Sequence, residues 1–183
     1  MSQEPLDLLS KGGRRYLIDT SAFIEFEEFY PPKDLELFWS FLDSKIKERK
    51  IFTVEEVFAE LDRKFYDREV TKWVNNRKKE LRFVYRPEHF EYLKNVVLKD
   101  CGEIIDLDMS NPEYADPMLL MVAGYEGFTI VTAEVRKDGL RPNTRPDKIK
   151  IPNYCDRLGI NHFSGKYAWR DFFKEEGLRI PKP

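Results

Sequence analysis

The stretch Arg15-Tyr16-Leu17-Ile18-Asp19-Thr20-Ser21 predicts a short buried strand that ends in a carboxylate and two hydroxyls. Its three central apolar residues suit the pleated surface of a sheet, and Asp19 ends the apolar run. Open α/β sheets bind ligands just beyond the carboxyl ends of their strands, which is where Asp19 would lie. Asp19 would also suit the N-cap of a following helix, and this stretch alone favours that role.

Short apolar runs alternate with helical periodicity along the rest of the chain. This order predicts a three-layer α/β/α fold around a central, mostly parallel sheet. Residues 1–14 indicate a polar N-terminal arm, and residues 15–183 indicate a single domain. We expect strands at residues 16–18, 51–54, 104–107, 128–132 and 149–151. We expect helices at residues 22–30, 34–49, 54–65, 67–82, 87–98, 117–125, 154–158 and 167–176.

The composition narrows the classes of protein that fit. The 31 basic and 33 acidic side chains among 183 residues leave a net charge of −2, which excludes a generally cationic surface for nucleic acid. The two cysteines have no CxxC spacing, so a zinc site is not indicated. No apolar run is long enough to span a bilayer, and no signal peptide is visible. We therefore expect a cytoplasmic protein without a membrane partner.

Three acidic residues follow or precede predicted elements at positions that one site could use. Asp19 ends the first strand, and Glu134 follows the strongest strand, over residues 128–132. Asp116 comes just before Pro117 and is the expected N-cap of a buried helix. Because strand ends and helix starts share one edge of a parallel sheet, we expect these three carboxylates to gather there.

A fourth acid, Glu60, flanks the apolar stripe of the helix over residues 54–65, although periodicity does not prefer it to Glu55. Carboxylates brought together repel one another unless a cation binds among them. An oxygen-rich site without His or Cys suits Mg²⁺ or Mn²⁺. Such a site supports hydrolysis of phosphodiester bonds by a metal-activated water. Taken singly, each acid is equally well explained as a helix cap or a surface charge.

Four ordered segments resemble the PIN-domain nuclease family and, within it, the VapC-like toxin ribonucleases. They are residues 17–21 (LIDTS), 57–61 (VFAEL), 115–119 (ADPML) and 130–134 (IVTAE). Residues 151–155 (IPNYC) are similar to a late segment in an uncharacterised prokaryotic branch of PIN-like proteins.

The resemblance implies a Mg²⁺- or Mn²⁺-dependent endoribonuclease that cleaves single-stranded or loop RNA. It also implies the toxin of a toxin–antitoxin pair, as a homodimer held inactive by an antitoxin protein. The catalytic and metal-binding positions would be the four acids named above. Ser21 or Thr20 would hydrogen-bond the first carboxylate, and Thr132 would act beside the last acid. Many relatives have Asp where this chain has Glu134, and Asp138 is the nearest alternative.

The loop after Glu134 is rich in basic residues. We expect it to overhang the acidic pocket and to contact RNA phosphates. The basic residues in or beside the loop are Arg136, Lys137, Arg141, Arg145, Lys148 and Lys150, and the first four are the expected substrate contacts.

Two other functions fit the same residues. A phosphohydrolase with Asp19 as nucleophile would usually carry a second Asp two residues on, where this chain has Ser21. A non-catalytic RNA-binding or regulatory module would keep the fold and lose the chemistry, as Glu134 in place of Asp suggests.

Overall fold

The computed structural model describes residues 13–102, 114–140 and 149–178. In these residues, four parallel strands form one sheet in the order β2-β1-β3-β4. The strands are β1 (Tyr16–Ile18), β2 (Ile51–Phe52), β3 (Thr129–Thr132) and β4 (His162–Ser164). Leu17 of β1 pairs with Phe52 on one side and with Ile130 on the other. The central strands β1 and β3 are completely buried, as their near-continuous apolar sequence predicts.

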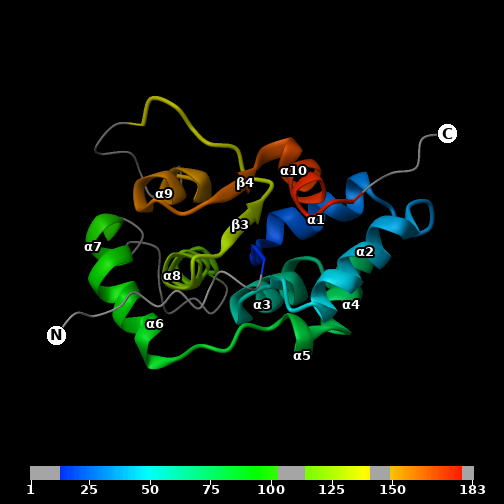
Figure 1. Cartoon of the computed structure of the whole chain (residues 1–183), viewed down its shortest axis with the longest axis horizontal. Helices are drawn as coiled ribbons and strands as arrows, with labels where there is room; N and C mark the ends of the chain where they lie inside the picture. The colour runs from blue at the N-terminus through cyan, green and yellow to red at the C-terminus, as the bar shows by residue number, and fades with distance from the viewer. Residues whose placement is uncertain (1–12, 103–113, 141–148, 179–183) are drawn as a thin grey trace.

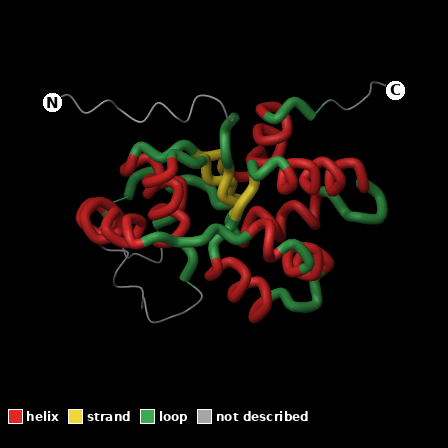
Figure 2. The backbone as a smooth tube through the Cα atoms, turned by 60° about the horizontal axis from the view of Figure 1, so that its bottom comes forward, coloured by secondary structure: helices red, strands yellow, loops and turns green. Residues whose placement is uncertain are grey.

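Helices lie on both sides of the strands, which gives the expected three-layer α/β/α fold (Figures 1 and 2). In Figure 1, α6 to α9 lie on the left of the strands, and α1, α2, α4 and α10 lie on the right. The α-helices are α1 (Thr20–Phe29), α2 (Glu36–Lys47), α3 (Glu55–Lys64), α4 (Glu69–Asn75), α5 (Lys78–Leu81), α6 (Pro87–Tyr92), α7 (Leu98–Asp100), α8 (Asp116–Glu126), α9 (Ile151–Leu158) and α10 (Ala168–Glu175). A π-helical turn, η1 (Leu93–Val97), joins α6 to α7, and a 3₁₀ turn, η4 (Gly165–Tyr167), precedes α10.

Aromatic packing fixes α1 against its neighbours. The Phe26 ring lies 4.7 Å from the Trp39 ring of α2 and 4.7 Å from the Trp169 ring of α10, measured between centroids. The Trp169 indole N–H donates a hydrogen bond of 2.8 Å to the Ala22 carbonyl. These contacts hold the start of α1, and with it Asp19, at the carboxyl end of β1.

Most of the predicted elements are confirmed, and two expectations are wrong. Residues 149–151 do not form a strand, because Ile151 begins α9 with Pro152 in its first turn, where proline is well tolerated. The expected helix over residues 67–82 is two helices, α4 and α5, interrupted at Asn76 and Arg77. The strand expected at residues 104–107 and residues 1–12 of the expected arm lie outside the described residues.

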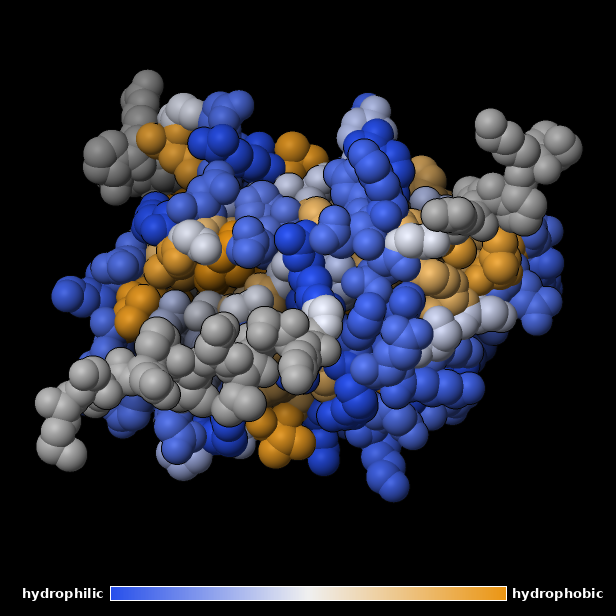
Figure 3. Space-filling model, in the orientation of Figure 1, coloured by the Kyte–Doolittle hydropathy of each residue, from blue (hydrophilic) through white to orange (hydrophobic). Residues whose placement is uncertain are grey.

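The surface is rich in charge, as 35% charged residues would suggest. On the face shown in Figure 3, hydrophilic residues separate several smaller hydrophobic patches. Among the described residues, no helix combines the length and the apolar character needed to cross a membrane.

Candidate active site

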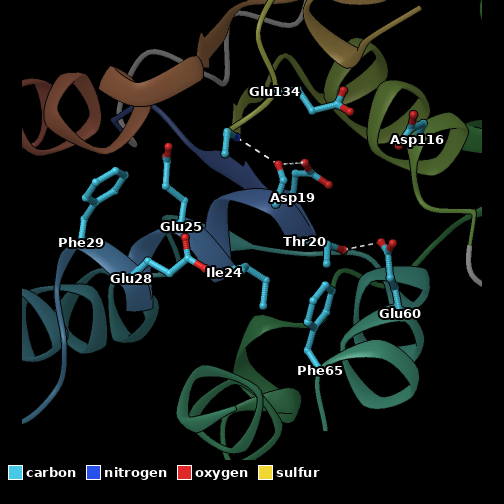
Figure 4. Close-up of a pocket in the computed structure, with 12 residues that line it drawn as sticks. Asp19, Thr20, Ile24, Glu25, Glu28, Phe29, Glu60, Phe65, Asp116 and Glu134 are labelled. Carbon is cyan, nitrogen blue, oxygen red and sulfur yellow. Dashed lines mark hydrogen bonds between the residues drawn. The ribbon is translucent and has the colours of Figure 1, made fainter. Parts of the chain in front are cut away.

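A pocket of about 480 Å³ opens at the carboxyl ends of β1 and β3 (Figure 4). The four predicted acids all line it, although they come from four separate parts of the chain. Two further carboxylates come from α1, so the lining carries six acidic side chains and no lysine or arginine. Its lining residues are Asp19, Thr20, Ser21, Ile24, Glu25, Glu28, Phe29, Glu60, Phe65, Asp116, Ala133 and Glu134.

Asp19 lies at the inner end of this pocket and is only 5% exposed. It occupies the N-cap position of α1, but its side chain makes no capping hydrogen bond. Its Oδ2 instead accepts hydrogen bonds from the hydroxyls of Ser21, at 2.5 Å, and Thr132, at 2.8 Å. A capping role therefore does not explain why an aspartate is buried at this position.

The two hydroxyls that hold Asp19 are themselves held by the backbone at the end of β3. The Ala133 N–H donates to the Ser21 hydroxyl at 3.0 Å, and the Glu134 N–H donates to the Thr132 hydroxyl at 3.1 Å. The two hydroxyl oxygens are also 3.1 Å apart. This network orients the Asp19 carboxylate through one oxygen, Oδ2. No hydrogen bond from the described residues reaches the other, Oδ1.

The N-cap of α8 is Ala115, so Asp116 is the first residue of the helix and not the expected N-cap. Its partly buried side chain forms no hydrogen bond and no ion pair within the described part of the chain. Burial raises the pKa of Asp116 well above its ordinary value, and the negative charges of Asp19, Glu134 and Glu60 raise it further. The charge of Lys150 opposes this rise, but none of the described cations contacts the Asp116 carboxylate.

Burial also raises the pKa of Asp19, to about 6. The hydrogen bonds from Ser21 and Thr132 oppose this rise, whereas the charges of Glu134 and Glu60 add to it. A perturbed carboxyl pKa in a cleft is typical of a functional site, and here two such groups share one pocket.

Glu60 and Glu134 differ from the two aspartates because each is paired with a lysine. Glu60 binds Lys64 through Oε1 at 2.6 Å and accepts the Thr20 hydroxyl on Oε2 at 2.6 Å. Glu134 binds Lys150 through Oε1 at 2.8 Å and accepts the Ile151 N–H on Oε2 at 2.8 Å. Both oxygens of each glutamate are therefore engaged.

These pairings bear on whether the residues fit a divalent cation. Within residues 13–102, 114–140 and 149–178, no three acidic, histidine or cysteine side chains are grouped so that they could hold a metal ion as they stand. The donor set still fits Mg²⁺ or Mn²⁺ chemically, because it consists of carboxylate oxygens, and Asp19 and Asp116 retain oxygens that no described residue contacts. Glu60 or Glu134 would have to release its lysine to become a third ligand.

The structure separates the acids predicted for the site from their rivals. Glu60 lines the pocket, whereas Glu55 pairs with Lys78 on another side of α3. Glu134 lines the pocket, whereas the side chain of Asp138 is 92% exposed and lies away from the lining residues. The pocket therefore contains Glu60 and Glu134, the two glutamates assigned to the site, and neither of their alternatives.

The loop residues predicted to bind RNA do not line the pocket where they are described. Arg136 is exposed and lies 3.1 Å from Asp156 of α9, while the Lys137 backbone N–H binds the Asn153 side chain. Arg141 and Arg145 lie outside the described residues. Their role as phosphate contacts stays a prediction.

The sequence did contain signals for site residues that the prediction did not include. Glu60 and Lys64 have the i, i+4 spacing of a helical ion pair. Glu25 and Glu28 follow Ser21 at i+4 and i+7, which places all three on one face of α1. Lys150 had no such signal, because it reaches Glu134 from 16 positions further along the chain.

Comparison with known protein families gives a match over most of the chain. The family described as a domain of unknown function, DUF4411, matches residues 16–176, from the first residue of β1 to just beyond α10. No curated protein matches the chain.

Proposed function

The chain belongs to the DUF4411 family, and from the geometry of its site we propose that it is a Mg²⁺- or Mn²⁺-dependent endoribonuclease of PIN type. The observation that carries the proposal is the meeting of Asp19, Glu60, Asp116 and Glu134 in one pocket at the carboxyl edge of a parallel sheet. The resemblance of the four segments to PIN nucleases supports the same conclusion.

We assign the binding of the cation to Asp19 and Asp116, whose pKa values burial raises and which form no ion pair with a described lysine. The charge of Lys150 opposes the rise at Asp116 without a direct contact. Ser21 and Thr132 would position Asp19 through its Oδ2. Glu60 and Glu134 would hold Lys64 and Lys150 near the pocket until the cation or the substrate separates them. When bound, the cation would lower the pKa of a water molecule and polarise a phosphoryl oxygen.

The biological setting follows from the resemblance alone. We propose a cytoplasmic toxin of a toxin–antitoxin pair that acts as a homodimer and is inhibited by an antitoxin protein. Growth arrest on expression, relieved by Asp116→Asn, is the expected result. Equal growth arrest by the wild type and by Asp116→Asn would contradict this setting.

The activity is tested by incubating the purified chain with single-stranded RNA and Mn²⁺. We expect internal cleavage that stops on chelation and is lost in Asp19→Asn and Asp116→Asn, with circular dichroism unchanged. Glu55→Gln is the control, because this glutamate lies outside the pocket. Equal cleavage by the wild type and both aspartate variants would rule out the proposed site.

The lysine pairs also favour a second candidate, a non-catalytic RNA-binding module. With both glutamates neutralised, the pocket could remain without a cation and still lie beside bound RNA. Retention of RNA in a gel-shift assay without cleavage at saturating Mn²⁺ would favour this candidate over the nuclease.

A further inference from the structure

A second hollow of about 360 Å³ adjoins the acidic pocket. Glu25 and Phe29 of α1 line both, so the two hollows are neighbours along α1. Figure 4 shows Glu25 between Phe29 and Asp19 in that view. Since α1 rises by 1.5 Å per residue, Phe29 lies about 15 Å from the acidic end of the helix.

The chemistry of the second hollow is opposite to that of the first. Its only carboxylate is Glu25, and its far side carries the cations Lys166 and Arg170 with the aromatic ring of Tyr167. The Lys166 ammonium lies 4.8 Å from the Tyr167 ring centroid, and the Arg170 guanidinium lies 4.1 Å from it. Arg170 also pairs with Asp171, whereas Lys166 has no ion pair with a described carboxylate. This group combines positive charge with an exposed aromatic surface.

The aromatic ring of Phe29 also lines the hollow, on the α1 side. Its side chain is 59% exposed, and within the described residues its ring contacts no other ring and no cation. Tyr167 is 47% exposed. Large exposed aromatic side chains beside cations are the usual platform on which proteins stack the bases of single-stranded nucleic acid.

The chain segment that carries Lys166 and Tyr167 begins at the same edge of the sheet as the acidic pocket. Ser164 of β4 pairs with Thr132 of β3, and Gly165 then turns the chain towards Lys166 and Tyr167. The Gly165 N–H donates a hydrogen bond of 2.9 Å to the Glu134 carbonyl. Gly165 has φ of 66°, a conformation that residues with a side chain rarely adopt. The position of the cations is therefore tied to the residue that ends the acidic site.

We propose that this second hollow, the α1–α10 subsite, binds the part of a single-stranded RNA that flanks the scissile phosphate. A base stacks on Phe29, and the neighbouring backbone phosphate contacts Lys166 and Arg170. This inference rests on the proposed nuclease function and adds the path that the RNA strand follows along α1. The carboxylates of the acidic pocket repel a phosphate backbone, and the charges of Lys166 and Arg170 would offset this repulsion for the flanking part of the strand.

The test measures KM and kcat for cleavage of a labelled, mixed-sequence single-stranded oligoribonucleotide in Mn²⁺. Phe29→Ala is expected to raise KM about tenfold, the size of effect that loss of a base–aromatic stack produces, with little change in kcat. Phe90→Ala is the matched control, because Phe90 of α6 is 46% exposed and lines neither hollow. Lys166→Gln is expected to raise KM a few-fold and to weaken the salt dependence of KM. Lys94→Gln, at an exposed lysine outside both hollows, is expected to change neither.

Calorimetric titration of Mn²⁺ into the same variants separates the two claims. We expect Phe29→Ala and Lys166→Gln to bind Mn²⁺ as the wild type does. If RNA is cleaved and Phe29→Ala has the KM of Phe90→Ala, the subsite is overturned and the nuclease proposal stands. A parallel loss of Mn²⁺ affinity in Phe29→Ala would also overturn it, because the ring would then act through the acidic pocket. If the wild type cleaves no RNA, both proposals fail.

Discussion

Four of the six carboxylates in the acidic pocket are predicted for one role, yet the structure divides these four into two kinds. Asp19 accepts hydrogen bonds from two hydroxyls, and Asp116 has no hydrogen-bond partner among the described residues. Burial raises the pKa of each. Glu60 and Glu134 are each held by a lysine and a second hydrogen-bond donor. The difference teaches that position at the edge of the sheet brings acids together, whereas the local partners decide which of them is available to a cation.

The largest expected effect separates the aspartates from the glutamates in catalysis. Asp19→Asn and Asp116→Asn should each lower the rate of RNA cleavage at least about 100-fold, since each removes a charge that holds the cation. Glu60→Gln and Glu134→Gln should lower it about tenfold, because these side chains are already engaged. Single-turnover cleavage assays would measure all four. Losses of equal size would show that the lysine pairs do not distinguish the two kinds.

The next effect concerns stability and pH. Because burial raises the pKa of Asp19 from 3.8 to about 6, the folded chain binds a proton more tightly than the unfolded chain. The contribution of Asp19 to stability therefore falls as pH rises from about 4 to 6 and is constant above that range. Asp19→Asn should stabilise the chain by about 1–3 kcal/mol at pH 7, with the gain disappearing below pH 4.

Urea unfolding at several pH values would measure this effect in the absence of metal. Glu134→Gln is the comparison, since it removes the partner of Lys150 and should not stabilise the chain at pH 7. A stability of Asp19→Asn at or below that of the wild type at pH 7 would argue against the raised pKa.

A smaller effect should follow from loss of a hydroxyl that positions Asp19. Thr132→Val removes the hydrogen bond to Asp19 Oδ2 and should slow cleavage about tenfold. That hydrogen bond lowers the pKa of Asp19, so the acid limb of the pH–rate profile should also move to higher pH. Thr129→Val in the same strand is the matched control, because the buried Thr129 hydroxyl has no partner. Similar pH–rate profiles for Thr132→Val and Thr129→Val would show that the Thr132 hydroxyl does not position Asp19.

The smallest effect tests whether the lysines compete with the cation. Lys150→Met frees one oxygen of Glu134 and removes a positive charge, so Mn²⁺ should bind about fivefold more tightly. Lys64→Met should act in the same direction through Glu60, and Lys94→Met should have no effect. Mn²⁺ titration measures the change, and weaker binding in Lys150→Met would mean that this lysine supports the site.

The elements that could be predicted from sequence are those whose own residues determine them. Tyr16–Ile18 and Thr129–Thr132 are apolar runs that end in polar side chains, and Gly127, with φ of 71°, ends α8 where a glycine is expected. These elements place Asp19, Asp116 and Glu134, so the location of the site was predictable. β4 was not, because its three partly exposed residues become a strand only through pairing with β3.

The ion pairs of the site were harder to predict from sequence than the position of its acids. The apolar pattern predicts a strand over residues 149–151, whereas Pro152 suits the first turn of the helix that begins at Ile151, so the sequence misplaces Lys150. The pairing of Lys150 with Glu134 depends on where α9 begins, which is a tertiary property. The resemblance to PIN nucleases located the acids but carried no information about their lysine partners.

Calorimetric titration of Mn²⁺ into the folded wild type and Asp19→Asn tests the central claim most directly. The account predicts binding to the wild type at pH 7 that is lost in Asp19→Asn, together with a thermal stabilisation by Mn²⁺ that only the wild type shows. Equal binding to both proteins, or no binding to the folded wild type, would contradict the claim that these carboxylates form a cation site.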